Sequence, residues 1–212
     1  MVPRTISTFL EVGCGTGFVL MGIQNAFPHI SLDATEFHPE GLAFARQRVP
    51  SCNFRIEDAR QLSKTCNYDC LGSFDVLEHI DDDMLVLRNF FDVLKPGGYI
   101  LLTVPQHPWL WSSTDVHAHH LRRYTRSELI RKVKLAHFSV EFCTSFVSLL
   151  LPLMMISRLS SQQKPYNVSD EFKIHPCLNS LFLCVMRLEF LLLRLGVRFP
   201  YGGSLILLAR KL

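Results

Sequence analysis

A glycine-rich turn near the amino end constrains the fold of this chain more than any other feature. The apolar residues 8–13 run into the sequence GCGTG at 13–17, and a helical pattern continues to residue 27. A buried strand that turns directly into a helix is typical of a βαβ unit. Glycine suits the turn because a side chain would block a ligand lying against the backbone. Taken alone, the turn could also be a purely structural connection.

Short β-type runs alternate with helical patterns through the first 145 residues, which predicts a mainly parallel sheet. Strands are expected near 8–13, 30–36, 52–57, 68–73 and 98–104, and helices at 17–27, 39–48, 82–94 and 125–137. Thr125 with Glu128 forms a capping box for the last helix. Residues 138–144 alternate like a sixth strand, and 204–209 suit a seventh.

Composition fits one α/β domain over residues 1–212. A hydrophobic fraction of 48% excludes disorder, and a net charge of +3 gives no support for nucleic-acid binding. Seven cysteines without paired spacing favour reduced thiols and a cytoplasmic location, with membrane association left open. The amino end lacks a signal-peptide pattern, so the sequon at Asn167 is expected to be chance.

Carboxylates follow the second and third expected strands, at the edge where open α/β folds bind ligands. Glu36 ends the second strand, where it can accept both hydroxyls of a ribose; Asp33 competes for this role. Asp58 follows the third strand and could accept from an adenine amino group. Each of these acids could also be a solvated surface residue.

As a set, these motifs resemble the class I S-adenosylmethionine (SAM)-dependent methyltransferases, together with DVLEHI at 75–80 and LKPGG at 94–98. The resemblance covers about residues 8–145 and is closest to ubiquinone-type small-molecule O-methyltransferases. It implies SAM as the cofactor. The implied cofactor-binding residues are Glu11, Gly13, Cys14, Gly15 and Gly17 around the methionine part, Glu36 and Phe37 at the ribose, Asp58 and Ala59 at the adenine, and Ser73 and Phe74 near the sulfonium.

A NAD-dependent oxidoreductase is the alternative for the first half of the fold. Its fingerprint places the last glycine one residue later and does not predict the turn at 94–98. SAM also lacks a pyrophosphate, so here the glycines would allow close packing and not anion capture.

Methyl transfer requires alignment of the acceptor and, for a hydroxyl, removal of its proton. His120 is the leading candidate for this base, because residues 120–125 resemble a stretch that borders the acceptor pocket in the family. His79 is the second candidate, more suited to shaping the site. No metal is predicted. As an alternative, Asp75, Glu78, His79 and His120 resemble the magnesium site of small-RNA 2′-O-methyltransferases, with aspartate in place of the first glutamate.

Residues 146–200 form an apolar insertion between the sixth and seventh strands, outside the core of 8–145 and 201–212. Residues 146–156 are too few to span a bilayer, and 181–195 carry charges at their centre. The segment 157–177 between them is polar and is expected to form a loop. Three interpretations stay open: a packed helical lid, a homodimer surface, or a peripheral contact with membrane or a lipid-like acceptor. The family also has helices before its first strand, whereas seven residues precede Thr8 here, which leaves the acceptor site and the completeness of the amino end open.

The sequence therefore predicts a Rossmann-like, mostly parallel seven-stranded sheet with helices on both faces, an antiparallel final strand and an apolar helical insertion. The expected activity is methyl transfer from SAM to a small-molecule or lipid-like acceptor, at oxygen. A metal-assisted RNA 2′-O-methyltransferase and a non-catalytic SAM-fold interaction protein are the alternatives.

Overall fold

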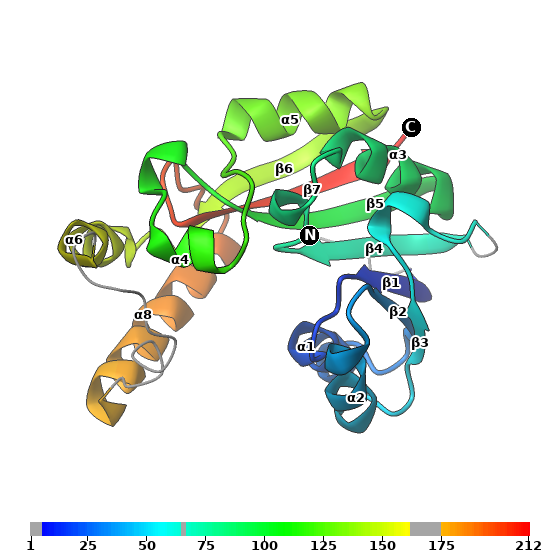
Figure 1. Ribbon diagram of the computed structural model, residues 1–212, viewed down its shortest axis with the longest axis horizontal. Helices are drawn as coiled ribbons and strands as arrows, with labels where there is room; N and C mark the ends of the chain where they lie inside the picture. The colour runs from blue at the N-terminus through cyan, green and yellow to red at the C-terminus, as the bar shows by residue number, and fades with distance from the viewer. Residues whose placement is uncertain (1–5, 65–66, 162–174) are drawn as a thin grey trace.

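The computed structural model contains one seven-stranded sheet and describes residues 6–64, 67–161 and 175–212. Its strands are β1 (Thr8–Val12), β2 (Ser31–Glu36), β3 (Asn53–Ile56), β4 (Tyr68–Phe74), β5 (Leu94–Pro105), β6 (Phe138–Phe146) and β7 (Ser204–Lys211). Their spatial order is β3-β2-β1-β4-β5-β7-β6. β1 to β5 pair in parallel, whereas β7 runs antiparallel to both β5 and β6. This confirms the predicted fold class (Figure 1).

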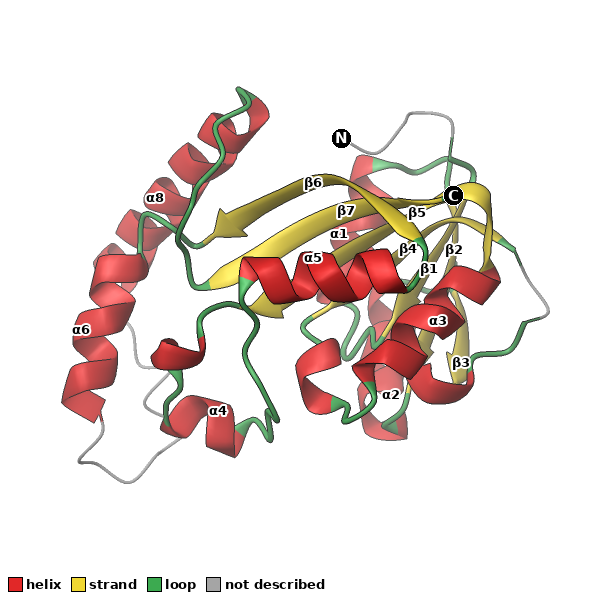
Figure 2. Ribbon diagram, turned by 90° about the horizontal axis from the view of Figure 1, so that it is seen from above, coloured by secondary structure: helices red, strands yellow, loops and turns green. Residues whose placement is uncertain are grey.

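Helices pack on both faces of the sheet (Figure 2). The α-helices are α1 (Phe18–Ala26), α2 (Pro39–Arg48), α3 (Asp83–Val93), α4 (Ser113–His117), α5 (Arg126–Leu135), α6 (Leu151–Ser161) and α8 (Pro176–Arg194). The described residues also form three short 3₁₀ turns, η1 (Ala59–Gln61), η2 (Leu77–His79) and η3 (Pro108–Leu110).

The strands separate two hydrophobic clusters because successive side chains point to opposite faces. In β1, Leu10 joins the cluster under α3 and α5, which includes Phe90 and Leu129. Its neighbour Phe9 joins the cluster under α1 and α2, which includes Leu20. The two clusters fix the sheet between helix layers, as Figure 1 shows for α3 and α5 above it and α1 and α2 below.

The expected strands and helices of the first 145 residues form within a few residues of their predicted bounds, and β5 differs most. It begins at Leu94, inside the segment expected to be a turn, and its pairing with β4 shifts register between Tyr68 and Cys70. The irregular pairing lets the LKPGG segment join the sheet although Gly97 has φ of +75°. Thr125 caps α5 by accepting from the backbone N–H of Glu128.

The apolar insertion between β6 and β7 is helical, as predicted, and consists of α6 and α8 in the described residues. α6 continues to Ser161, so residues 157–161 are helix although a loop was expected there. Most of the rest of the expected loop lies at 162–174, outside the described residues. α8 begins at Pro176 and runs for 19 residues.

Candidate active site

The site lies at the carboxyl edge of the parallel strands, and strand register explains why. β1 pairs with β2 so that Val12 lies opposite Thr35, and with β4 so that Glu11 lies opposite Gly72. The next residues along these strands therefore leave the sheet side by side. In an open α/β sheet this edge is where ligands bind.

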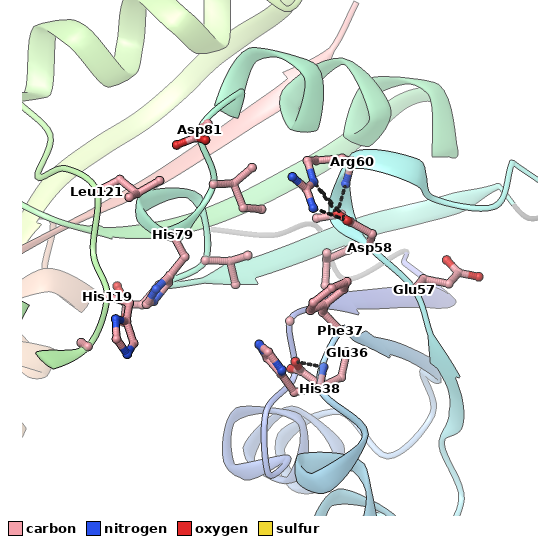
Figure 3. A pocket seen from close by; sticks show the side chains of 17 residues that line it. Glu36, Phe37, His38, Glu57, Asp58, Arg60, His79, Asp81, His119 and Leu121 are labelled. Carbon is pink, nitrogen blue, oxygen red and sulfur yellow. Dashed lines mark hydrogen bonds and ion pairs between the residues drawn. The ribbon is translucent and has the colours of Figure 1, made fainter. Parts of the chain in front are cut away.

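A pocket of about 590 Å³ opens at this edge. Its lining comes from the ends of β1, β2, β3 and β4 and from the loop after α4. The lining residues are Val12, Gly13, Glu36, Phe37, His38, Glu57, Asp58, Ala59, Arg60, Asp75, Val76, His79, Ile80, Asp81, Ala118, His119 and Leu121. Figure 3 shows Glu36, Phe37 and Asp58 on one side of the pocket, and His79 and His119 on the other.

The glycine turn at 13–17 holds two backbone positions that other residues tolerate poorly. Gly13 has φ of +77°, and a Cβ there would lie 2.5 Å from Cγ2 of Val76. Gly17 has φ of +80°, and a Cβ there would lie 3.0 Å from Cα of Ala45 in α2. At Gly15, φ is +51° but a Cβ would meet nothing within 4 Å. The turn thus packs closely at Gly13 and Gly17 and leaves open space at Gly15.

Glu36 is oriented by two backbone N–H groups. Its Oε2 accepts from Gly15 at 2.8 Å, and its Oε1 accepts from His38 at 3.0 Å. Each carboxylate oxygen keeps a further lone pair, and the side chain borders the pocket. Asp33, its competitor in the sequence, instead accepts from Asn53, Arg55 and Tyr68 and is absent from the lining. The carboxylate that can take two ligand hydroxyls is therefore that of Glu36.

Glu11 lies buried behind the glycine turn with 2% of its surface exposed. Its Oε2 has no hydrogen-bond partner in the described structure. Burial and the nearby charge of Glu36 raise the pKa of Glu11 to about 8. A buried carboxyl without a partner is costly, and a cationic group nearby would offset that cost. The turn is thus suited to a ligand with a positive charge.

Asp58 and Ala59 both line the pocket, as the resemblance implied. The Asp58 carboxylate caps η1 by accepting from the backbone of Arg60 and pairs with the Arg60 guanidinium at 2.6 Å. This pairing lowers the pKa of Asp58. Sequence reasoning did not anticipate Arg60, which occupies much of the hydrogen-bonding capacity of Asp58.

The pocket lining lacks six of the implied cofactor residues: Glu11, Cys14, Gly15, Gly17, Ser73 and Phe74. Ser73 is 1% exposed, and its hydroxyl has no partner among the described residues. Phe74 packs partly buried against the cluster under α1 and α2. Cys14 is buried, and burial raises the pKa of its thiol to about 12, so this cysteine is neutral and unreactive.

The predicted histidines lie together, but His79 and not His120 borders the pocket. Their rings meet edge to face with centroids 4.8 Å apart. Nδ1 of His120 lies 3.0 Å from Oδ1 of the buried Asp115, which holds the His120 ring in place. His119, which belongs to the same histidine-rich stretch but was not the favoured residue, lines the pocket. Its φ of +56° makes consecutive side chains leave the loop in different directions, and the sequence HAHH alone gave no signal for this.

The electrostatics of this wall favour a neutral His79. Partial removal from water and the neighbouring His120 lower its pKa. Asp115 also pairs with Arg123 at 2.7 Å and with Arg158 of α6 at 3.0 Å, and its pKa lies well below the usual value. A neutral imidazole that faces a pocket can accept a proton.

Glu78, His79 and His120 bring one ligand atom each within 4.8 Å of one another. Glu78 is fully buried, and neither of its carboxylate oxygens has a hydrogen-bond partner in the described structure. Because His120 can donate through Nδ1 to Asp115, its Nε2 is left to face Glu78 Oε1 at 3.9 Å. Asp75, the fourth residue of the magnesium alternative, lines the pocket but does not join this group.

Comparison with known proteins agrees with the fold and the motifs. Residues 10–100 match a family described as methyltransferase domain. These residues are therefore similar to a methyltransferase domain, which agrees with the class I SAM-dependent family expected from the motifs. SAM is the cofactor of this class, as the sequence implied.

Individual relatives and solved structures extend this comparison. A malonyl-acyl-carrier-protein O-methyltransferase 1 from Ilyobacter polytropus is 32% identical over 94 residues, covering 43% of this chain and 35% of that protein. Among solved structures, a phosphoethanolamine N-methyltransferase 2 of Haemonchus contortus in complex with SAM has a TM-score of 0.65 at 17% identity, covering 99% of this chain and 49% of that chain.

The N-methyltransferase NodS from Bradyrhizobium japonicum, in complex with S-adenosylhomocysteine, has a TM-score of 0.59 at 15% identity, covering 97% of this chain and 78% of that chain. These structures share the fold of this chain. The curated relatives are longer, since the match to the Ilyobacter polytropus protein spans about a third of its length.

Proposed function

We propose that this chain binds SAM in the pocket at the carboxyl edge of the sheet and transfers its methyl group to an oxygen of a small-molecule or lipid-like acceptor. The observation that carries the proposal is the position of Glu36. Its carboxylate is oriented by two backbone N–H groups and faces a pocket that also contains a neutral histidine. These are the two requirements of the reaction, a cofactor clamp and a proton acceptor.

The residues present fit SAM. Glu36 would accept the two ribose hydroxyls with its remaining lone pairs. The unpartnered, buried Glu11 would compensate the positive charge of the methionine part, and Ala59 with Asp58 would border the adenine. SAM supplies a methyl group already activated by its sulfonium. The protein therefore needs to position the acceptor, exclude water and remove a proton.

His79 is the best-placed group for proton removal in this proposal. It borders the pocket, and its lowered pKa keeps it neutral at physiological pH. His120 would act behind it as a positioning residue, since Asp115 holds its Nδ1. Direct proton transfer by His120 stays a prediction, and it requires the loop at 118–121 to turn the ring toward the pocket.

The acceptor side of the pocket supports an acceptor with apolar parts. Phe37, Ile80 and Leu121 contribute apolar side chains to its lining. Transfer to oxygen is supported by the relative from Ilyobacter polytropus, which is an O-methyltransferase. An acceptor attached to a carrier protein or to a lipid would satisfy both features.

The experiment is a methyl-transfer screen with isotopically labelled SAM and a panel of hydroxylated acceptors, preceded by mass spectrometry of ligands that co-purify with the protein. Labelled product that disappears in His79→Gln supports the proposal. SAM binding without turnover across the panel and with the co-purified ligands would favour the non-catalytic alternative. Failure to bind SAM at all would exclude the proposed function.

A second candidate is metal-assisted methylation of RNA ends, favoured by one observation. Glu78, His79 and His120 cluster, with Glu78 unpartnered. The residues fit a divalent cation in number and type of ligand. Transfer to an RNA 3′ end that requires added Mg²⁺ or Mn²⁺, and is lost in Glu78→Gln, would establish this candidate. Activity on small molecules that is indifferent to a chelator would exclude it.

A further inference from the structure

α8 has more exposed apolar surface than a helix of a water-soluble protein normally carries. By length and composition it could cross a membrane, and 6% of the relevant window is buried within the described structure. Leu181, Leu188 and Leu195 recur every seven residues and are 57%, 51% and 73% exposed. α6, at the same end of the sheet as α8 (Figures 1 and 2), adds Ile156, which is 64% exposed. Such a surface marks an interaction site.

One buried side chain, that of Glu189, attaches α8 to the rest of the protein. Glu189 is fully buried, and its carboxylate accepts from the backbone N–H of Ser148 at 2.8 Å and of Leu149 at 2.9 Å. These two residues precede α6, so the bonds hold α8 against the amino end of its neighbour. This attachment to the rest of the domain suits a helix that lies along a membrane surface better than one that crosses the bilayer.

The exposed charged side chains described on and around α6 and α8 are all positive. Across the described residues 147–161 and 175–201, the exposed charged side chains are Arg187, Arg194 and Arg198, and the one carboxylate is the buried Glu189. Arg187 and Arg194 are two helical turns apart and emerge between exposed leucines. Long cationic side chains can keep their charge at a headgroup while their stems cover apolar surface.

An anionic surface complements this pattern better than a second copy of the chain does. A two-fold pairing sets the same face of both copies together. In such a pair the arginines of one α8 would face those of the other, because α8 has no exposed carboxylate that could pair with them. Anionic lipids supply the opposite charge as well as an apolar layer for the leucines.

Two exposed tryptophans adjoin these helices. Trp109 and Trp111, in and after η3, are 57% and 38% exposed. Arg158 of α6 donates to the backbone oxygen of Leu110 between them and to Ser112 Oγ. Tryptophan favours the boundary between headgroups and acyl chains. Three neighbouring elements thus present side chains suited to the same environment.

We propose that α6, α8 and the Trp109–Trp111 turn form a docking surface for an anionic lipid bilayer, with the leucines and tryptophans inserted at the interface and Arg187 and Arg194 at the headgroups. The surface joins the active-site loop through Arg158, which also pairs with Asp115. Docking would therefore bring the pocket close to acceptors carried in the membrane. The lipid contact itself does not depend on methyl transfer.

The test uses the full chain and vesicles of phosphatidylcholine, alone or mixed with phosphatidylglycerol, without SAM. Co-sedimentation and tryptophan fluorescence measure binding, since Trp109 and Trp111 are the two tryptophans of the sequence. We expect binding to the mixed vesicles with a blue shift, and at least about tenfold weaker binding for Arg187→Glu/Arg194→Glu. The matched control is Arg131→Glu/Lys134→Glu on α5, which has the same charge change and should bind like the wild type.

Circular dichroism of each variant verifies folding. Wild-type protein that stays in the supernatant with both vesicle types would overturn the proposal, as would equal loss of binding in the α5 control. A stable dimer in sedimentation velocity that fails to bind vesicles would assign the surface to a second copy. Because no cofactor is present, failure of this test leaves the proposed methyl transfer unaffected.

Discussion

At the residue scale, the site depends on two carboxyl groups in different environments. Glu36 is ordered by backbone N–H groups and borders the pocket, whereas Glu11 is buried without a partner for Oε2. The two groups lie close enough for the charge of Glu36 to raise the pKa of Glu11. An ordered carboxylate clamp beside a buried acid of raised pKa prepares the site for a ligand with hydroxyls and a positive charge.

Glu11 should release a proton when SAM binds. Its pKa of about 8 means that the carboxyl is protonated at neutral pH, and a cationic ligand would lower that pKa. Calorimetry at pH 7 in phosphate and in Tris should therefore give different observed enthalpies, and Glu11→Gln should abolish the difference. Equal enthalpies in both buffers for the wild type would contradict this assignment.

The same pKa shift affects stability. Because the folded-state pKa of Glu11 is raised from 4.5 to about 8, the folded state holds a proton that the unfolded state loses. The free energy of unfolding should therefore decrease as pH rises between these values. Glu11→Gln removes this pH dependence. The denaturation midpoint of the variant minus that of the wild type should therefore be larger at pH 9 than at pH 5.

His79 should determine the acid side of the pH profile for methyl transfer. Its pKa is lowered, so kcat should remain high below the ordinary histidine value of about 6.5. His79→Gln should reduce kcat about 10²–10⁴-fold and leave SAM affinity close to wild type. His29→Gln, at an exposed histidine outside the pocket lining, is the control. Unchanged kcat in His79→Gln would assign proton removal to another group.

At the scale of elements, the first strand–turn–helix unit was predictable because its constraints are local. The glycines at 13 and 17 occupy left-handed backbone positions that few other residues adopt, so the sequence itself reveals the turn. Glu36 was predictable for the same reason, since the ends of adjacent parallel strands must meet at one edge. The family motifs then made the prediction more specific, from a nucleotide-like ligand to SAM.

The opposite wall was less predictable because it depends on long-range contacts. Asp115 fixes His120, and it is itself held by Arg123 and by Arg158, which lies 43 positions along the chain. No spacing in the sequence shows whether Asp115 binds His119 or His120. The pairing of Arg60 with Asp58 was missed for a related reason, since side-chain direction in a loop is not periodic.

Two glycine substitutions should distinguish the cost of close packing in the turn from the cost of backbone strain. Gly13→Ala places a methyl 2.5 Å from Val76 at positive φ, so we expect a loss of about 2–4 kcal/mol in the free energy of unfolding. Gly15→Ala meets no neighbour and should cost about 1 kcal/mol, from backbone strain alone. Urea unfolding measures both. Equal losses in the two variants would contradict the difference in packing.

Asp115 should stabilise the active-site loop strongly. Asp115→Asn leaves the buried Arg123 without its counterion, and we expect a loss of about 3–5 kcal/mol. The control Asp92→Asn breaks an exposed pair with Lys64 and should cost less than about 1 kcal/mol. Thermal unfolding of both variants checks the prediction, and similar shifts would show that the Asp115 network is not stabilising.

At the scale of the whole molecule, the pocket and the exposed apolar helices lie on different parts of the sheet. Its parallel half carries the pocket, and the insertion between β6 and β7 carries the exposed apolar helices. The insertion was predicted as helical, but its environment was not predictable, since an apolar helix suits a core, a partner or a membrane equally well. The single-domain organisation and the cytoplasmic location stay predictions.

The most direct test of the central claim is calorimetry with SAM and S-adenosylhomocysteine. Wild-type protein and Glu40→Ala, which changes an exposed acid on α2, should bind one molecule per chain with similar affinity. Glu36→Ala removes the ribose clamp and should bind about ten- to a hundredfold more weakly. Absence of binding by the wild type, or unchanged affinity in Glu36→Ala, would contradict the account.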